Sequence, residues 1–252
     1  MPSVQLDLEG PVARITLNRP HVLNAGDPAW VAELGDAVAR VGARRDLRAA
    51  VITGAGRAFS TGLDLNALAA GELRLPHLVA WEDAMTAIER MPLPWIAAIN
   101  GHCLGGGLQL ALVCDYRLAS ADALLGLPAV KECLIPSMSL YRLPRLIGAA
   151  RARALILTGE PIAAARAEAC GLVDEVVPAS EFPRALEACV ARFLALPAVS
   201  VTVSKRLLAR AFDLPFDAFR KEMEAGLGRC LDSAEHRAAM DEIRRRPRRP
   251  AR

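Results

Sequence analysis

The chain of 252 residues is predicted to adopt an α/β fold, and three features of the sequence predict it. Short apolar segments typical of buried strands alternate with longer segments of helical spacing, a pattern typical of largely parallel strand pairing. The chain is 53% hydrophobic, which is enough to bury a sizeable core. Only 4% of the residues are aromatic, so the core is expected to consist mainly of Ala, Leu, Val and Ile.

Two predicted strands and a helix come first. Residues 4–8 and 12–18 alternate apolar and polar side chains on either side of a Gly-Pro pair. This pattern predicts two antiparallel strands joined by a turn. Residues 28–41 have helical spacing, and Pro28 suits the first turn of that helix.

Buried strands and helices then alternate. Apolar runs predict strands over residues 49–53, 95–100 and 116–120. Helical spacing predicts helices over residues 78–91 and 108–114. This order, strand and then helix, is the origin of the α/β prediction.

The C-terminal part of the chain is predicted to be helical. Apolar residues from Phe182 to Leu194 recur at helical spacing, which predicts one helix there. Three further helical patterns cover residues 199–212, 215–231 and 233–246. Because no strand signal occurs in this last part, we expect a core of residues 1–197 followed by a helical region of residues 198–252.

The net charge of +3 conceals an uneven distribution. The last nine residues hold six of the 31 basic residues and no acid, which leaves 25 basic against 28 acidic residues elsewhere. A nucleic-acid-binding domain needs positive charge spread over one face, so nucleic acid is excluded as a partner. The Arg-rich tail is expected to be a solvated end.

Composition also indicates the compartment. The chain has no run of about 18 uncharged apolar residues, so no membrane-spanning helix is expected. Its start lacks a basic segment followed by an apolar one, so no secretory signal is predicted. The six cysteines are far apart and form no C-x-x-C pair, which argues against a metal site or a disulfide framework. We therefore expect reduced thiols in a cytoplasmic protein.

Two glycine-bearing segments follow buried strands, a loop over residues 54–62 and a turn over residues 101–107. In the second, Gly105, Gly106 and Gly107 expose backbone N–H groups at the positive end of the next helix. Such a turn can hold a phosphate or an oxyanion, or it can simply allow close packing of helix on strand. A P-loop is excluded because no Lys-Ser or Lys-Thr follows the glycines, and neither segment reads G-x-G-x-x-G.

Several stretches together resemble the crotonase family, which is the enoyl-CoA hydratase/isomerase superfamily. They occur in the family's order and spacing, and they cover nearly the whole chain. The stretches are residues 15–20 with Asn24 and Ala25, 59–65, 96–115, 143–148, 157–159 and 169–174.

The resemblance implies a crotonase-like spiral of β-β-α turns in residues 1–197, which binds acyl-CoA. It implies a helical C-terminal trimerisation region in residues 198–252, and hence a homotrimer or a hexamer built as a dimer of trimers. It also implies a role in fatty acid metabolism. Coenzyme A is part of the substrate in this family, so no separate cofactor is expected.

By the same resemblance, the backbone N–H groups of Leu63 and Gly106 form an oxyanion hole for the thioester carbonyl oxygen. Such donors stabilise the enolate that forms when charge moves onto that oxygen. Asp64 and Asn66 are expected to cap the turn and the following helix. The residues implied to contact coenzyme A are His21, Val22, Leu23, Ala25, Ser60, Thr61, Gly62, Asp64 and Gly105.

Two positions depart from the family's hydratase pattern. Hydration in this family uses two glutamates as general acid and base, and the matching positions hold Gln109 and Ala129. An amide can position a water but cannot take up or deliver a proton at neutral pH, and alanine has no polar group. Ordinary hydration is therefore expected to be weak or absent, which favours isomerisation or decarboxylation. A non-catalytic acyl-CoA-binding protein is the alternative.

Glu132 is the leading candidate for a relocated acid/base, because it lies three residues beyond the second lost glutamate. The competing interpretation is a surface residue paired with Lys131 or an arginine, because charged side chains are usually exposed. Glu82 and Asp83, on the predicted helix over residues 78–91, are weaker candidates.

Overall fold

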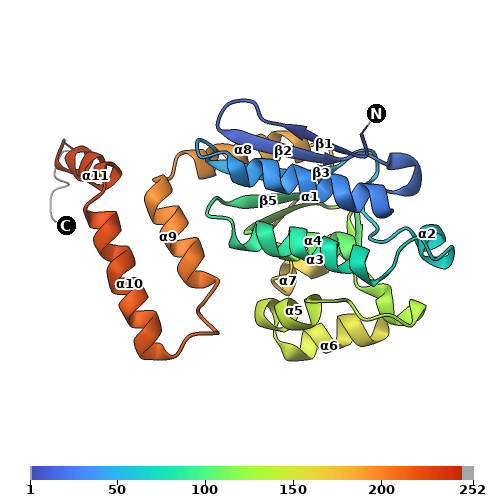
Figure 1. Ribbon diagram of the computed structural model, residues 1–252. Coiled ribbons are helices and arrows are strands. Elements are labelled where there is room, and N and C mark those ends of the chain that lie inside the picture. The colour runs from blue at the N-terminus through green and yellow to red at the C-terminus, as the bar shows by residue number, and fades with distance from the viewer. Residues whose placement is uncertain (1, 246–252) are drawn as a thin grey trace.

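The computed structural model describes residues 2–245, whose strands form two sheets (Figure 1). The first sheet has the order β1-β2-β3-β5-β7-β10, with strands Val4–Asp7, Val12–Leu17, Ala49–Gly54, Trp95–Ile99, Tyr116–Ser120 and Glu175–Val177. The second has the order β4-β6-β8-β9, with strands Ala58–Ser60, His102–Leu104, Leu124–Gly126 and Ile162–Ala163.

The described residues also contain eleven α-helices and two short 3₁₀ helices. Helices α1 to α6 are Pro28–Ala43, Leu65–Ala69, Leu75–Arg90, Gly106–Leu112, Ser139–Ile147 and Ala149–Thr158. Helices α7 to α11 are Ala164–Ala169, Phe182–Leu194, Ala198–Leu208, Phe216–Leu231 and Ala234–Arg245. The 3₁₀ helices are Pro20–Val22 (η1) and Pro128–Glu132 (η2). Residues 246–252 of the predicted Arg-rich tail lie outside the described range.

Consecutive strands enter the two sheets in turn. β3, β5 and β7 belong to the first sheet, and each is followed by β4, β6 or β8 of the second. Most neighbours pair in parallel, so that Ile52 lies opposite Ala97 and Leu104 opposite Gly126. The exceptions are β1 with β2 and β8 with β9, which pair antiparallel. The α/β fold and the spiral of β-β-α turns are therefore confirmed.

The loop predicted over residues 54–62 and the turn predicted over residues 101–107 are each wrong in part, because they contain β4 and β6. These strands have three residues each, too few for an alternating pattern to appear. They form because successive turns of the spiral pair with one another. Glycine makes that approach possible: a Cβ at Gly101 would lie 2.1 Å from the Arg57 carbonyl oxygen.

The first sheet buries apolar residues on both faces, as a parallel sheet covered by helices must. On one face, Ile15 and Ile52 pack in the main core with Trp30 and Leu34 of α1 and with α3. On the other face, β2, β3, β5 and β7 meet α8. That smaller cluster contains Val12, Val51, Ile96, Ala98, Leu118, Phe182, Cys189 and Val190. The apolar face predicted for residues 182–194 is thus confirmed.

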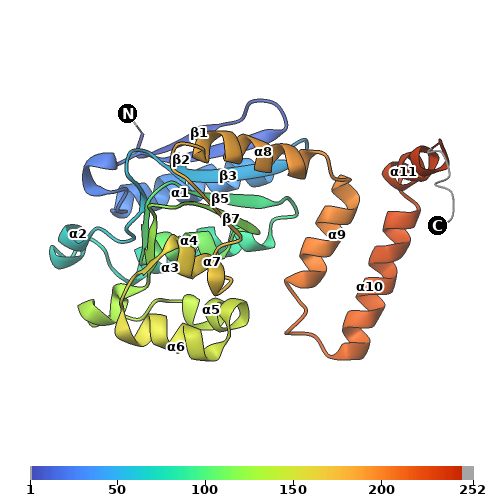
Figure 2. The same ribbon diagram turned by 180° about the vertical axis from the view of Figure 1, so that it is seen from behind.

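Helices α9, α10 and α11 form an arm beside the body of the molecule (Figures 1 and 2). Lys205 anchors α9 to the body, because its Nζ donates to the Leu93 carbonyl oxygen at 2.9 Å and pairs with Asp115 at 2.7 Å. Burial raises the pKa of Asp115, and Lys205 opposes that shift. The arm begins at Ala198, which is also where the helical region predicted from the sequence starts. The division of the chain into two domains stays a prediction.

Glu235 of α11 caps the N-terminus of α9 and gives the arm a pH dependence. Its carboxylate accepts the N–H groups of Val199 at 2.9 Å and Ala198 at 3.0 Å, and these bonds lower its pKa. A lowered pKa stabilises the folded arm above the ordinary carboxyl pKa, and this is lost as pH falls through the lowered value. We expect the protection factors of these two amides against hydrogen exchange, which correct for the intrinsic pH dependence of exchange, to fall at acid pH. Glu235→Gln should lower these protection factors at neutral pH and remove their fall at acid pH; an unchanged profile would contradict the prediction.

None of the described helices is by itself long and apolar enough to cross a membrane. Helices α8 and α9 meet the requirements of length and composition only as a pair, and they are bent by 99° where they join.

Candidate active site

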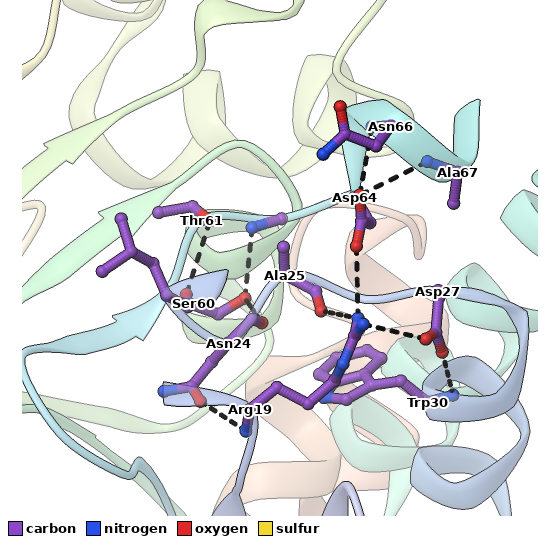
Figure 3. Close-up of polar contacts among 12 residues, drawn as sticks. Arg19, Asn24, Ala25, Asp27, Trp30, Ser60, Thr61, Asp64, Asn66 and Ala67 are labelled. Atoms are coloured by element: carbon purple, nitrogen blue, oxygen red, sulfur yellow. Dashed lines mark hydrogen bonds and ion pairs between the residues drawn. The ribbon is translucent and has the colours of Figure 1, made fainter. Parts of the chain in front are cut away.

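Arg19 joins two loops at the edge of the candidate site (Figure 3). Its guanidinium donates to the Ala25 carbonyl oxygen at 2.6 Å and pairs with Asp27 at 3.0 Å and Asp64 at 3.4 Å. Only 15% of the Arg19 side chain is exposed, so solvent screens these pairs less than surface pairs. Arg19 therefore fixes the loop of residues 19–27 against the turn that precedes α2.

Asn24 joins the same loop to β4 through hydrogen bonds of its buried side chain. Its buried Nδ2 donates to the carbonyl oxygens of Ala55 at 2.9 Å, Ala58 at 2.8 Å and Phe59 at 3.2 Å. Its Oδ1 accepts the backbone N–H of Arg19 at 2.8 Å. The φ angle of Asn24 is +57°, a left-handed conformation that asparagine tolerates better than most residues.

Local hydrogen bonds shape the turn after β4. The Ser60 hydroxyl donates to the Asn24 carbonyl oxygen at 2.9 Å and accepts the Gly62 N–H at 3.1 Å. Asp64 accepts the N–H groups of Asn66 and Ala67, so its predicted capping role for α2 is confirmed (Figure 3). The Asn66 side chain takes no part in this cap, since only its backbone N–H does.

The turn after β4 touches the turn before α4, backbone against backbone. A Cβ at Gly62 would lie 2.4 Å from the Gly106 nitrogen, and one at Gly107 would lie 2.1 Å from the Ser60 carbonyl oxygen. A Cβ at Gly106 would lie 2.7 Å from the Trp81 ring. Because each distance is shorter than a carbon contact allows, the glycines are required for the two turns to meet.

Two backbone N–H groups are left without an acceptor where these turns meet. Neither Leu63 nor Gly106 donates a backbone hydrogen bond to another described residue. Gly106 is the first residue of α4, so its N–H has no acceptor within the helix. Free donors so placed can stabilise an oxygen on which negative charge develops.

Leu63 and Gly106 both line a cavity of about 320 Å³ between α3, α4 and the segment before α5. The cavity is mainly apolar, and its polar side chains are two carboxylates, one amide, one hydroxyl and the indole of Trp81. Its lining residues are Leu63, Leu75, Leu78, Val79, Trp81, Glu82, Asp83, Met85, Gly106, Gln109, Leu134, Ile135 and Ser137. An apolar pocket with a few polar groups beside free donors is the usual form of a small-molecule site.

Comparison with known proteins places this geometry in a family. The model of the enoyl-CoA hydratase/isomerase family matches residues 7–242. The chain belongs to the enoyl-CoA hydratase/isomerase family. It is 37% identical to an (E)-benzylidenesuccinyl-CoA hydratase of Thauera aromatica over 85% of each chain. It is 32% identical to a short-chain-enoyl-CoA hydratase of Clostridium acetobutylicum, over 94% of this chain and 93% of that one.

Solved structures agree with this membership. The crystal structure of an enoyl-CoA hydratase of Mycobacterium smegmatis has a TM-score of 0.91 to this chain at 29% identity, with 98% of this chain and 99% of that chain covered. An enoyl-CoA hydratase of Bacillus anthracis has a TM-score of 0.90 at 28% identity, with 96% of each chain covered. The resemblance to the crotonase superfamily is therefore confirmed.

The acid/base candidates predicted from the sequence differ in whether they line the cavity. Gln109, Glu82 and Asp83 line the cavity together with Leu63 and Gly106. By contrast, Glu132 is exposed at the end of η2 and is not a cavity residue. Lys131, its suggested surface partner, pairs instead with Glu160 at 2.8 Å.

The residues predicted to contact coenzyme A lie on the loops that Arg19 and Asn24 hold, or at the start of α4. His21 is exposed on η1, and Leu23 and Thr61 are partly exposed. Ala25, Ser60 and Gly62 are buried, whereas Val22, Asp64 and Gly105 are partly exposed. Within the described residues, no group of three or more His, Cys, Asp or Glu side chains is placed to hold a metal ion.

Arg142 is the polar residue of this region that the sequence did not reveal. It lies in α5 with 7% of its side chain exposed, and it pairs with Glu82 at 2.7 Å and Glu89 at 3.0 Å. No local pattern points to it, because its hydrogen-bonding partner Glu89 is 53 residues away. The segment of α5 contains both Arg142 and Arg145, so residue type alone could not single out Arg142.

Proposed function

We propose that this protein binds an acyl-CoA thioester and stabilises its enolate. The thioester carbonyl oxygen accepts hydrogen bonds from the Leu63 and Gly106 N–H groups, and the acyl group occupies the apolar cavity beside them. The observation that carries this proposal is that the two residues with free N–H donors, Leu63 and Gly106, both line that cavity. One such donor typically contributes about 10²–10³ in rate.

The coenzyme A portion lies, in this proposal, along residues 21–25 and 60–64. These segments are held rigidly by Arg19 and Asn24, and rigid loops cost little entropy to order on binding. The ligand therefore meets a binding surface that exists before it arrives.

The proposed reaction is isomerisation or decarboxylation rather than two-glutamate hydration. Gln109 lines the cavity but has no acidic proton to exchange, and Ala129 lies in η2 without a polar side chain. General acid or base catalysis contributes about 10²–10⁴ per group, so the loss of both groups disables ordinary hydration. The same losses favour the second candidate, a non-catalytic acyl-CoA-binding protein.

Binding and enolate formation are to be measured separately. Calorimetric titration with butyryl-CoA measures binding, and exchange of its α-protons in D₂O measures enolate formation. Turnover of crotonyl-CoA, 3-enoyl-CoA and methylmalonyl-CoA then separates the reactions. Absence of binding would overturn the proposal, binding without exchange or turnover would favour the second candidate, and rapid crotonyl-CoA hydration would contradict the roles given to Gln109 and Ala129.

A cytoplasmic location is part of this proposal. All six cysteines are free, which fits a reducing compartment. Burial raises the pKa of Cys114 to about 12 and that of Cys103 well above its ordinary value. Neither buried thiol therefore supplies a thiolate nucleophile near the site.

We further propose that residues 198–252 assemble the protein into a homotrimer, or a hexamer built from two trimers. The arm exposes Leu208, Phe212 and Phe216 to 71%, 75% and 78%, and large apolar side chains exposed together mark association surfaces. Replacing Phe216 by serine is expected to shift the mass measured by analytical ultracentrifugation toward the monomer, whereas the Lys221→Ala control should not. A monomeric wild-type protein would contradict this proposal.

A further inference from the structure

Glu82 of α3 brings a carboxylate into the cavity that holds the free N–H groups. It lines this cavity with Leu63, Gly106 and Gln109. Only 16% of its side chain is exposed, whereas Asp83, the other carboxylate of the cavity, is exposed. Glu82 is therefore the more enclosed of the two groups that could move a proton inside the cavity.

The two oxygens of the Glu82 carboxylate are held differently. Oε1 accepts the Arg142 guanidinium at 2.7 Å and the Thr86 hydroxyl at 3.3 Å. Oε2 accepts only the Ser137 hydroxyl, at 3.3 Å, among the described residues, and Ser137 itself lines the cavity. Because a carboxylate oxygen has two lone pairs, Oε2 keeps the capacity to take up a proton.

Arg142 orients the Glu82 carboxylate and also pairs with a second carboxylate, that of Glu89. Its Nε and Nη2 donate to Glu89 at 3.1 Å and 3.0 Å, so its single positive charge is shared between two carboxylates. With 7% of its side chain exposed, Arg142 has little freedom to move. It therefore acts as a positioning residue that holds Oε1 and leaves Oε2 available.

The charge of the cavity lining selects against an acidic acyl group. Two carboxylates and no Lys, Arg or His side chain line it. A substrate carboxylate, which a decarboxylation requires, would meet two like charges, and the cation beside Glu82, Arg142, is already shared with Glu89. An uncharged acyl chain would instead contact Leu78, Val79 and Met85.

We propose that Glu82 is the catalytic residue of a 1,3-proton shift in an apolar β,γ-unsaturated acyl thioester, a step that rests on the proposed enolate-stabilising function. The Cα–H bond breaks, its proton goes to Glu82 Oε2, and the electron pair moves onto the thioester oxygen held by Leu63 and Gly106. The enolate then collapses, the double bond moves to Cα and Cβ, and the same proton passes from Glu82 to Cγ. The product is the α,β-unsaturated thioester, and no co-reactant is needed.

The test uses full-length protein with 3-hexenoyl-CoA as substrate. Glu82→Gln is expected to lower kcat by at least about 100-fold, the usual loss of a general base, while KM stays within about threefold. Glu82→Asp, which keeps the carboxylate, should recover part of the rate. Glu89→Gln makes the same chemical change on the other carboxylate that Arg142 holds, outside the cavity, and is expected to keep kcat within about threefold of the wild type.

Each alternative has its own signature. If Glu89→Gln lowers kcat as much as Glu82→Gln, the effect comes from disturbing Arg142, and the role of Glu82 is overturned. It is also overturned if Asp83→Asn or Glu132→Gln abolishes turnover while Glu82→Gln retains it. If the wild type itself binds butyryl-CoA but neither exchanges α-protons nor isomerises 3-hexenoyl-CoA, the enolate function fails before any variant is compared.

Discussion

Replacing Gly106 by alanine is expected to lower the rate of α-proton exchange of butyryl-CoA by about 10²–10³-fold, the usual loss of an oxyanion-hole donor. The new Cβ would lie 2.7 Å from Trp81 and 3.2 Å from the Gly62 Cα. Trp81 cannot retreat, because it is buried with its ring centre 4.6 Å from that of Trp30. The turn must move instead, which displaces the Gly106 N–H from that of Leu63.

The matched control is another helical glycine replaced by alanine. Gly35 lies in α1 with nothing within 4 Å of a Cβ built there. Gly35→Ala should leave exchange unchanged and stabilise the fold by about 0.5–1 kcal/mol, since alanine restricts the unfolded chain. Full exchange activity in the Gly106→Ala variant would show that this N–H does not hold the thioester oxygen.

Replacing Asn24 by alanine is expected to lower the free energy of unfolding by about 3 kcal/mol. The carbonyl oxygens of Ala55, Ala58 and Phe59 would lose the donor that they share, and the bonds to Ala58 and Phe59 are buried. Alanine would also have to adopt the left-handed conformation that Asn24 has at φ +57°. Denaturant unfolding followed by circular dichroism measures this difference.

Asn66→Ala is the control for this variant. Its side chain is exposed at the start of α2, and only its backbone N–H bonds to Asp64. Its unfolding free energy should stay within about 0.5 kcal/mol of the wild type. Should Asn24→Ala prove as stable as Asn66→Ala, the bonds of Asn24 would not be what holds the 19–27 loop. In that case the loop would depend mainly on Arg19.

The elements that could be predicted from the sequence are those whose pattern is local. The strand over residues 12–18 alternates apolar and polar residues, and α8 repeats its apolar face over three turns, so both are confirmed. The strands β4, β6 and β8 have three residues each and no pattern of their own. Their formation depends on parallel partners from other turns of the spiral, which no local window contains.

The start of helix α3 is another feature that the local sequence pattern did not predict. Helical spacing predicted residues 78–91, whereas the helix begins at Leu75 with Pro76 in its first turn. Leu75 is 72% exposed and adds nothing to the apolar stripe, so the spacing could not reveal it. Proline favours a first helical turn, which was the available signal.

The sequence by itself determined the α/β spiral and the family, because these depend on residue type and order. Only the tertiary structure decided which carboxylates line the cavity. Trp81, Met85 and Ile88 turn one face of α3 into the core, which leaves Glu82 at the cavity and beside Arg142. Glu132 is the leading acid/base candidate of the sequence, yet it is exposed on η2. Distance along the chain does not set distance in space, because packing of a helix face decides where its flanking side chains lie.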